Sequence, residues 1–134
     1  MIEYLLDTNI CIYIIKRKPV QVFEKFKSLS FGSIGISSIT LAELQYGIMK
    51  SSIPERNREA LEIFLTPLEI VDFDYNATIE YGKIRADLER KGTPIGPLDT
   101  LIASHALSLD LTLITNNEKE FSRIPGLKIE NWTK

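Results

Sequence analysis

The chain alternates short apolar segments with segments of helical periodicity, and this order constrains its fold more than any other feature. The apolar segments, which we predict to be strands, lie at residues 2–6, 34–37, 68–73, 111–114 and 127–129. Helical spacing of apolar residues predicts helices at residues 9–17, 19–29, 41–50, 54–65, 75–91, 98–109 and 118–121. Strands that are apolar on both faces and alternate with helices are typical of a parallel sheet covered on both sides. We therefore predict one α/β domain over residues 1–134, a three-layer α/β/α sandwich with a mainly parallel sheet.

Composition restricts the chemistry that this domain can perform. The chain has 134 residues with one cysteine and one histidine, Cys11 and His105. This excludes an internal disulfide, a cysteine-rich zinc site and any mechanism that needs two imidazoles. We expect both side chains to be buried, because each lies among apolar neighbours. No segment approaches the length of a membrane span, and the first residues carry no basic stretch before an apolar one, so we expect a cytoplasmic protein without a signal peptide.

Two groups of basic residues stand out against a net charge of −2. The first lies in residues 16–27, and the second contains Lys83, Arg85, Arg90 and Lys91. On charge alone, solvated helix faces explain both groups better than a nucleic-acid surface does. If the second group does bind a phosphate backbone, Arg85 is the residue that we expect to contact it.

Four carboxylates fall where strands end or helices begin. Asp7 follows the first predicted strand, Glu43 the second and Glu120 the fourth, while Asp99 opens the helix that returns to the sheet. In parallel sheets, sites lie beyond the carboxyl ends of the strands, so we expect these groups to converge. Clustered carboxylates repel unless a cation neutralises them, and a set of hard oxygen ligands favours Mg²⁺ or Mn²⁺ over zinc.

Each of these carboxylates also has a purely structural interpretation. Asp7 and Thr8 can cap the first helix, and Asp99 can complement the dipole of its own helix. The patterns Thr40-x-x-Glu43 and Asn117-x-x-Glu120 match capping boxes. Taken singly, capping is the better explanation for each carboxylate. Taken together, the four favour a metal site, with hydroxyls of Thr8, Thr40 and Thr115 placed to orient it.

The residues around these carboxylates resemble the PIN-domain ribonucleases, specifically the VapC toxins of bacterial toxin–antitoxin pairs. The resemblance rests on four motifs in order, LDTN at 6–9, SSITLAEL at 37–44, GTPIGPLDTLIA at 92–103 and LITNNEKEF at 113–121. Any one of them is weak evidence, but four at these separations are highly specific. They extend over nearly the whole chain and imply a single PIN domain.

The resemblance implies roles for particular residues. Asp7, Glu43 and Asp99 would be the ligands of Mg²⁺, for which Mn²⁺ could substitute. Many relatives carry a fourth acidic residue where this chain has Asn117, and Glu120 could supply that carboxylate one helical turn later. The supporting positions implied by the motifs are Thr8, Asn9, Thr40, Thr115 and Asn117.

The implied activity is metal-dependent hydrolysis of RNA to 5′-phosphate and 3′-hydroxyl ends, as in relatives that cut initiator tRNA in its anticodon loop. The implied partners are a VapB-type antitoxin, a second copy of the chain in a homodimer or larger assembly, and the RNA. Two other classes remain open from the residues themselves. A signalling receiver domain would need an adjacent acidic pair after the first strand, where this chain has Asp7 alone. A non-catalytic RNA- or protein-binding module of the same fold would show no cleavage with either metal.

Overall fold

Five parallel strands form the centre of the molecule. The computed structural model describes residues 1–134, and the strands are β1 (Tyr4–Leu6), β2 (Ile34–Ser37), β3 (Glu69–Val71), β4 (Thr112–Ile114) and β5 (Ile129–Glu130). Their order is β3-β2-β1-β4-β5, and all four pairings are parallel. The first strand is therefore the middle one, with Tyr4 opposite Ile34 on one side and Thr112 on the other. The predicted five-stranded parallel sheet is confirmed.

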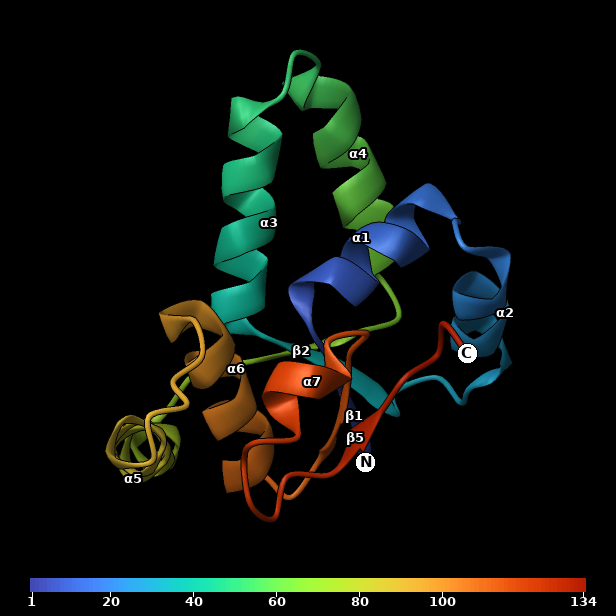
Figure 1. The fold of residues 1–134 in the computed structure, drawn as a ribbon. Helices are drawn as coiled ribbons and strands as arrows, with labels where there is room; N and C mark the ends of the chain where they lie inside the picture. The colour runs from blue at the N-terminus through green and yellow to red at the C-terminus, as the bar shows by residue number, and fades with distance from the viewer.

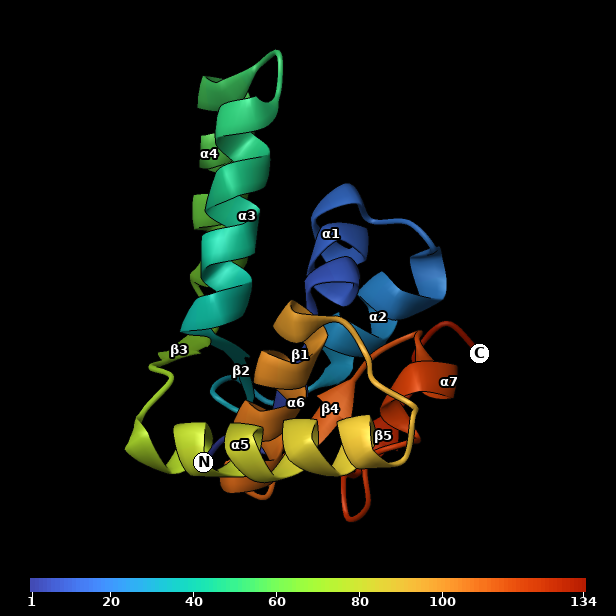
Figure 2. The ribbon, with the colours of Figure 1, turned by 60° about the vertical axis from the view of Figure 1, so that its left-hand side comes forward.

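Seven helices cover the two faces of this sheet (Figures 1 and 2). They are α1 (Thr8–Lys16), α2 (Val20–Ser28), α3 (Ser38–Lys50), α4 (Pro54–Leu65), α5 (Tyr75–Arg90), α6 (Pro97–Ser108) and α7 (Glu118–Phe121). Helices α3 and α4 form a hairpin that projects away from the sheet, as Figure 2 shows. No helix combines the length and the apolar character needed to cross a membrane.

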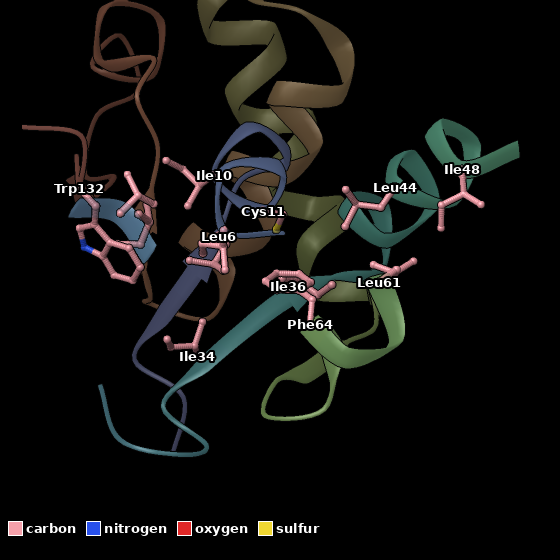
Figure 3. Packing of buried hydrophobic residues seen from close by; sticks show 13 residues of the cluster. Leu6, Ile10, Cys11, Ile34, Ile36, Leu44, Ile48, Leu61, Phe64 and Trp132 are labelled. Carbon is pink, nitrogen blue, oxygen red and sulfur yellow. The ribbon is translucent and has the colours of Figure 1, made fainter. Parts of the chain in front are cut away.

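Alternation along the strands divides the apolar core into two layers. Leu6, Ile36 and Ile114 pack with α1 to α4 in one cluster, which Figure 3 shows from close by. Leu5 and Leu113, their neighbours along β1 and β4, pack with α5, α6 and α7 in the other cluster. Successive strand residues point to opposite faces, so β1 and β4 each supply both layers. The predicted three-layer α/β/α sandwich is confirmed, and Cys11 is fully buried in the first cluster, as expected.

The start of α3 differs from the prediction. We expected the helix at residue 41 with Thr40 as its cap, but it begins at Ser38. Ser37 is the N-cap, and its hydroxyl accepts a 3.0 Å hydrogen bond from the Ile39 amide. Serine at the end of a buried strand satisfies an otherwise unpaired helix amide, so it starts the helix three residues early. The Thr40-x-x-Glu43 capping box is therefore wrong, and both residues lie inside the helix.

Other boundaries agree with the sequence to within a few residues. Helix α5 ends at Arg90 and is followed by Gly92 at φ +72°, a left-handed conformation that glycine adopts without strain. This confirms Gly92 as the predicted stop. The last strand is later than predicted, at residues 129–130, where it pairs with β4.

Candidate metal-dependent nuclease site

The elements that carry the four candidate carboxylates meet around the end of the central strand. Asp7 follows β1 directly and caps α1, while Glu43 lies in the second turn of α3, which leaves the end of β2. Asp99 lies in the first turn of α6, and Glu120 lies in α7, which follows β4. Figure 1 shows the beginning of α3 beside α6, with α7 in front of the sheet. The fold thus brings residues from four distant parts of the chain to one edge.

Asp7 is the most buried of the four, with 5% of its surface exposed. Burial is the largest cause that raises its pKa, to about 6. Hydrogen bonds from Thr115 and from the Ile10 amide, the latter 2.9 Å long, act in the opposite direction. The negative charges of Asp99 and Glu43 raise the pKa further. Asp7 therefore caps α1, as one interpretation predicted, and also lies in a shared acidic environment.

Asp99 is partly buried and lies near two of the other carboxylates. Burial raises its pKa first, and the charges of Glu120 and then Glu43 add to this. The helix is capped by Gly96 with no side-chain bond, so Asp99 does not serve as the N-cap. The charges of Glu120 and Glu43 act on Asp99, and those of Asp99 and Glu43 act on Asp7, so the four carboxylates interact electrostatically, and we call them the acidic cluster.

Two neutral side chains hold the glutamates of this cluster. The Thr8 hydroxyl donates a 2.6 Å hydrogen bond to Oε1 of Glu43. The Asn117 amide donates a 2.8 Å hydrogen bond to Oε1 of Glu120. Asn117 lies at the N-cap position of α7, yet its side chain makes no capping bond, so the predicted capping box is wrong. Its amide is instead directed toward the glutamate one turn later.

The remaining supporting positions have different surroundings. Thr115 is fully buried. Its hydroxyl accepts a 3.0 Å hydrogen bond from the backbone N–H of Asn117, and the Thr115 side chain also contacts Asp7. Thr40 is fully buried, and its hydroxyl has no hydrogen-bond partner. Asn9 is exposed in the first turn of α1. Thr8 and Thr115 thus contact the carboxylates directly, whereas Thr40 and Asn9 contact none of them.

The donor set fits a hard divalent cation. All four groups are carboxylates, and no histidine or thiolate accompanies them, which is the ligand type that Mg²⁺ and Mn²⁺ prefer. No three acidic, histidine or cysteine side chains are placed so that they could hold one ion together. Mg²⁺ commonly takes only one or two carboxylates directly and keeps several waters. A buried aspartate with an elevated pKa, surrounded by like charges, is the environment that such a cation would stabilise.

Arg85 lies outside the acidic cluster. It is exposed on α5, where its guanidinium donates to the Tyr81 hydroxyl at 2.8 Å and to Glu89 at 3.3 Å. Together with Pro94, Pro97 and other residues it lines a cavity of about 220 Å³ beside the loop that leads to Asp99. The two lysines of this predicted basic group pair with acidic residues one turn away. Lys83 pairs with Glu80, and Lys91 pairs with Asp87. The second basic group is therefore partly neutralised on its own helix.

Two tertiary contacts near the site had no signal in the sequence. The Asn116 amide donates a 3.1 Å hydrogen bond to the Tyr13 hydroxyl, which connects β4 to α1. His105 was expected in the core and is 1% exposed, but its contact with Ser37, at 2.8 Å between Nδ1 and Oγ, could not be foreseen. Both pairs join residues about 70 or more positions apart, so only the folded chain reveals them.

The chain is similar to known proteins over nearly its whole length. The PIN domain family model matches residues 4–127. The chain is 52% identical, over 98% of its length and 99% of the relative's, to the tRNA(fMet)-specific endonuclease VapC of Salmonella typhimurium. It is 52% identical to Ribonuclease VapC2 of Rickettsia felis, over 98% of each chain. The chain also superposes on a chain in the crystal structure of VapBC2 from Rickettsia felis bound to a DNA fragment from their promoter, with a TM-score of 0.92. The two chains are 51% identical, and the superposition covers 98% of this chain and 99% of the other.

Proposed function

The chain belongs to the PIN domain family, and we propose that it is a metal-dependent endoribonuclease that acts as the toxin of a toxin–antitoxin pair. The observation that carries this proposal is the cluster of Asp7, Glu43, Asp99 and Glu120 around one edge of the sheet. Nearly full-length identity of 52% to a tRNA(fMet)-specific endonuclease supports a tRNA as the substrate. A tRNA substrate in turn implies action in the cytoplasm.

In this proposal Asp7, Glu43 and Asp99 surround Mg²⁺, with Mn²⁺ as a substitute, and one or two of these carboxylates bind the ion directly while the rest act through its waters. The bound cation would supply an activated water and neutralise charge on the phosphate that is cut. Thr8 fixes one oxygen of Glu43, and Asn117 fixes one oxygen of Glu120, so neither glutamate needs to be oriented when RNA binds. Glu120 takes the fourth acidic position, because its charge acts on Asp99 while Asn117 supplies only an amide.

Arg85 would contact the phosphate backbone of the RNA on the side of the site formed by α5 and the loop before Asp99. Its guanidinium lines the cavity with Pro94 and Pro97 and remains exposed. Binding of a phosphate there would compete with Glu89, which now accepts from Arg85. Local positive charge offsets the acidic body of the protein where the backbone must approach.

The proposed antitoxin would cover the groove between α1 and the α3–α4 hairpin. This groove has a volume of about 290 Å³, is lined largely by apolar residues that include Ile12, Ile15 and Leu61, and contains Glu43. A peptide seated there would bury the exposed side of α1 and reach the acidic cluster at the same time. The structures of VapBC complexes superpose closely on this chain, which supports a partner of this kind, and the exposed Tyr46 and Met49 on α3 are available for contact with a second copy.

The experiment that tests the activity is cleavage of initiator tRNA by the purified chain, with Mg²⁺ and with chelator. We expect cleavage only with the metal, and fragments that end in 5′-phosphate and 3′-hydroxyl groups. Fragments with 2′,3′-cyclic phosphates would contradict the proposed chemistry. Failure to cut any RNA with Mg²⁺ or Mn²⁺ would favour a non-catalytic binding module of the same fold.

A further inference from the structure

The only histidine of the chain forms a buried hydrogen bond between two elements of the proposed site. His105 in α6 is 1% exposed and Ser37 at the end of β2 is fully buried. Nδ1 of the imidazole lies 2.8 Å from Oγ of Ser37, across 68 residues of sequence. The same hydroxyl accepts from the Ile39 amide at the start of α3. The imidazole is therefore connected to the residue that starts the helix carrying Glu43.

This bond lies at the same sequence distance from two of the carboxylates. Asp99 precedes His105 by six residues on α6, and Glu43 follows Ser37 by six residues on α3. Six helical residues correspond to about 9 Å along a helix axis. Helices α3 and α6 contact each other, and the charge of Glu43 acts on Asp99. The bond between His105 and Ser37 thus connects α6 to the start of α3, and Asp99 and Glu43 lie about the same distance from it along the two helices.

The surroundings confine the imidazole and favour its neutral form. The ring of Phe73 packs edge-on against it, with ring centroids 5.3 Å apart. Burial lowers the pKa of His105, while the charge of Asp74, a hydrogen bond to the backbone of Asp72 and the charge of Asp72 act in the opposite direction. Nε2 is buried and has no hydrogen-bond partner, so Nδ1 makes the ring's one side-chain hydrogen bond. A buried ring with a directional side-chain hydrogen bond can fix the relative position of two helices.

We propose that His105 is a positioning residue, which through Ser37 holds α6 against the start of α3 and so sets the separation of Asp99 and Glu43. The proposal rests on the proposed function, because it assumes that these carboxylates share one cation. His105 itself would touch neither the metal nor the RNA. Its contribution would be comparable to that of residues that orient metal ligands without touching the metal. Loss of such residues weakens metal binding or activity about 10- to 100-fold.

Two amide substitutions separate the hydrogen bond from the volume of the ring. In His105→Asn the side-chain amide can take the place of Nδ1 and reach Ser37, whereas in His105→Gln the longer side chain carries its amide toward the place of Nε2. We expect His105→Gln to weaken Mg²⁺ binding, measured by calorimetry without RNA, about tenfold, and His105→Asn to stay within about threefold of wild type. For tRNA cleavage we expect kcat to follow the same order while KM stays unchanged, because the RNA contacts lie elsewhere.

Several outcomes would overturn the proposal. Equal Mg²⁺ affinity in wild type and both variants would show that the bond does not position the ligands, and equal losses in both would show that only the ring volume matters. If either variant melts below the assay temperature, Ser37→Thr and Ser37→Ala give the same comparison from the other side, since threonine keeps the hydroxyl and the cap. If wild type cuts no RNA, the proposed function fails, but the order of Mg²⁺ affinities still tests the role of His105.

Discussion

The hydroxyl of Thr8 donates a 2.6 Å hydrogen bond to Oε1 of Glu43, joining the first turn of α1 to the second turn of α3. Thr8 stands next to Asp7, so one short segment after β1 both supplies a carboxylate and orients another. The bond leaves the second oxygen of Glu43 without a protein hydrogen bond. The bond therefore restricts the orientation of the Glu43 carboxylate, although the two residues lie 35 positions apart.

Replacing Thr8 by valine should impair cleavage more than folding. Valine keeps the shape of threonine but cannot hold Glu43, and loss of an orienting bond of this kind costs about tenfold in kcat. The melting temperature should change little, because the bond is only partly buried and contributes about 1 kcal/mol. Single-turnover cleavage of tRNA by Thr8→Val and Thr8→Ser provides the comparison, and serine should restore most of the rate. Equal rates in the two variants would show that Glu43 does not depend on this hydroxyl.

Asp7→Asn should abolish cleavage while the protein stays folded and binds its antitoxin. Asparagine keeps an oxygen for the Ile10 amide, so the cap of α1 survives, but it removes one negative ligand. We expect activity to fall by at least about 100-fold, the upper range for lost metal binding. Asp110→Asn is the matched control, because Asp110 is exposed and its φ of +56° suits asparagine equally well. An unfolded Asp7→Asn protein would mean that Asp7 serves mainly as a cap.

The stability of the metal-free protein should fall as pH rises between about 4 and 6. The pKa of Asp7 is raised from 3.8 to about 6 by folding, so in this window the folded state binds the proton that the unfolded chain has released. The stabilisation by this protonation is complete below the unfolded pKa and is lost as pH passes the folded pKa, a difference of about 3 kcal/mol. Urea titrations in chelator should show this slope in wild type. A flat profile in wild type, or the same slope in Asp7→Asn, would contradict the assignment.

Asp99→Asn should stabilise the metal-free protein and remove most of its response to Mg²⁺. Loss of one charge relieves repulsion from Glu120 and Glu43, worth about 1 kcal/mol after solvent screening of this half-exposed group. Added Mg²⁺ should raise the melting temperature of wild type, because the ion binds the folded site and hardly the unfolded chain. Melting curves in chelator and in millimolar Mg²⁺ measure both effects. If both proteins gain equally from Mg²⁺, Asp99 is not a ligand.

Arg85→Ala should weaken RNA binding and reduce its dependence on salt without changing the melting temperature. Arg85 is exposed, and its side-chain hydrogen bonds go only to Tyr81 and Glu89 on its own helix, so its removal leaves the core intact. Loss of one phosphate contact lowers the slope of affinity against salt by about one unit. Arg58→Ala is the control, since Arg58 forms a similar pair with Glu55 on α4. Unchanged affinity of Arg85→Ala at low salt would identify this arginine as part of a solvated helix face.

The layers and the strand positions were predictable because local patterns determine them. Leu5 and Leu6 are adjacent and apolar. A central parallel strand needs such a pair because its two faces pack into different apolar clusters. The start of α3 was not predictable with the same certainty. Ser37, Ser38 and Thr40 are all acceptable caps, and the choice of Ser37 depends on where β2 ends against its neighbours, which is a tertiary property.

The positions of the proposed carboxylates at one edge of the sheet could be predicted from the sequence, but the contacts that orient them could not. Asp7, Glu43 and Asp99 stand at strand ends and helix starts, where topology alone predicts convergence. The bonds of Thr8 to Glu43 and of Ser37 to His105 depend on side-chain directions after the sheet has formed. Thr40 was expected to orient a carboxylate and has no partner at all, since its place inside α3 directs it into the core.

The order of strands also determines when the proposed site can exist while the ribosome makes the chain. Strand β1 is translated first but lies in the middle of the sheet, and its second neighbour, β4, begins only at Thr112. The last carboxylate, Glu120, follows Asp7 by 113 residues and Glu43 by 77 residues. A nascent chain that stops short of this point contains no complete acidic cluster, whatever part of it has folded. A cell that makes this protein would therefore meet the full set of proposed catalytic groups only on chains that extend past Glu120.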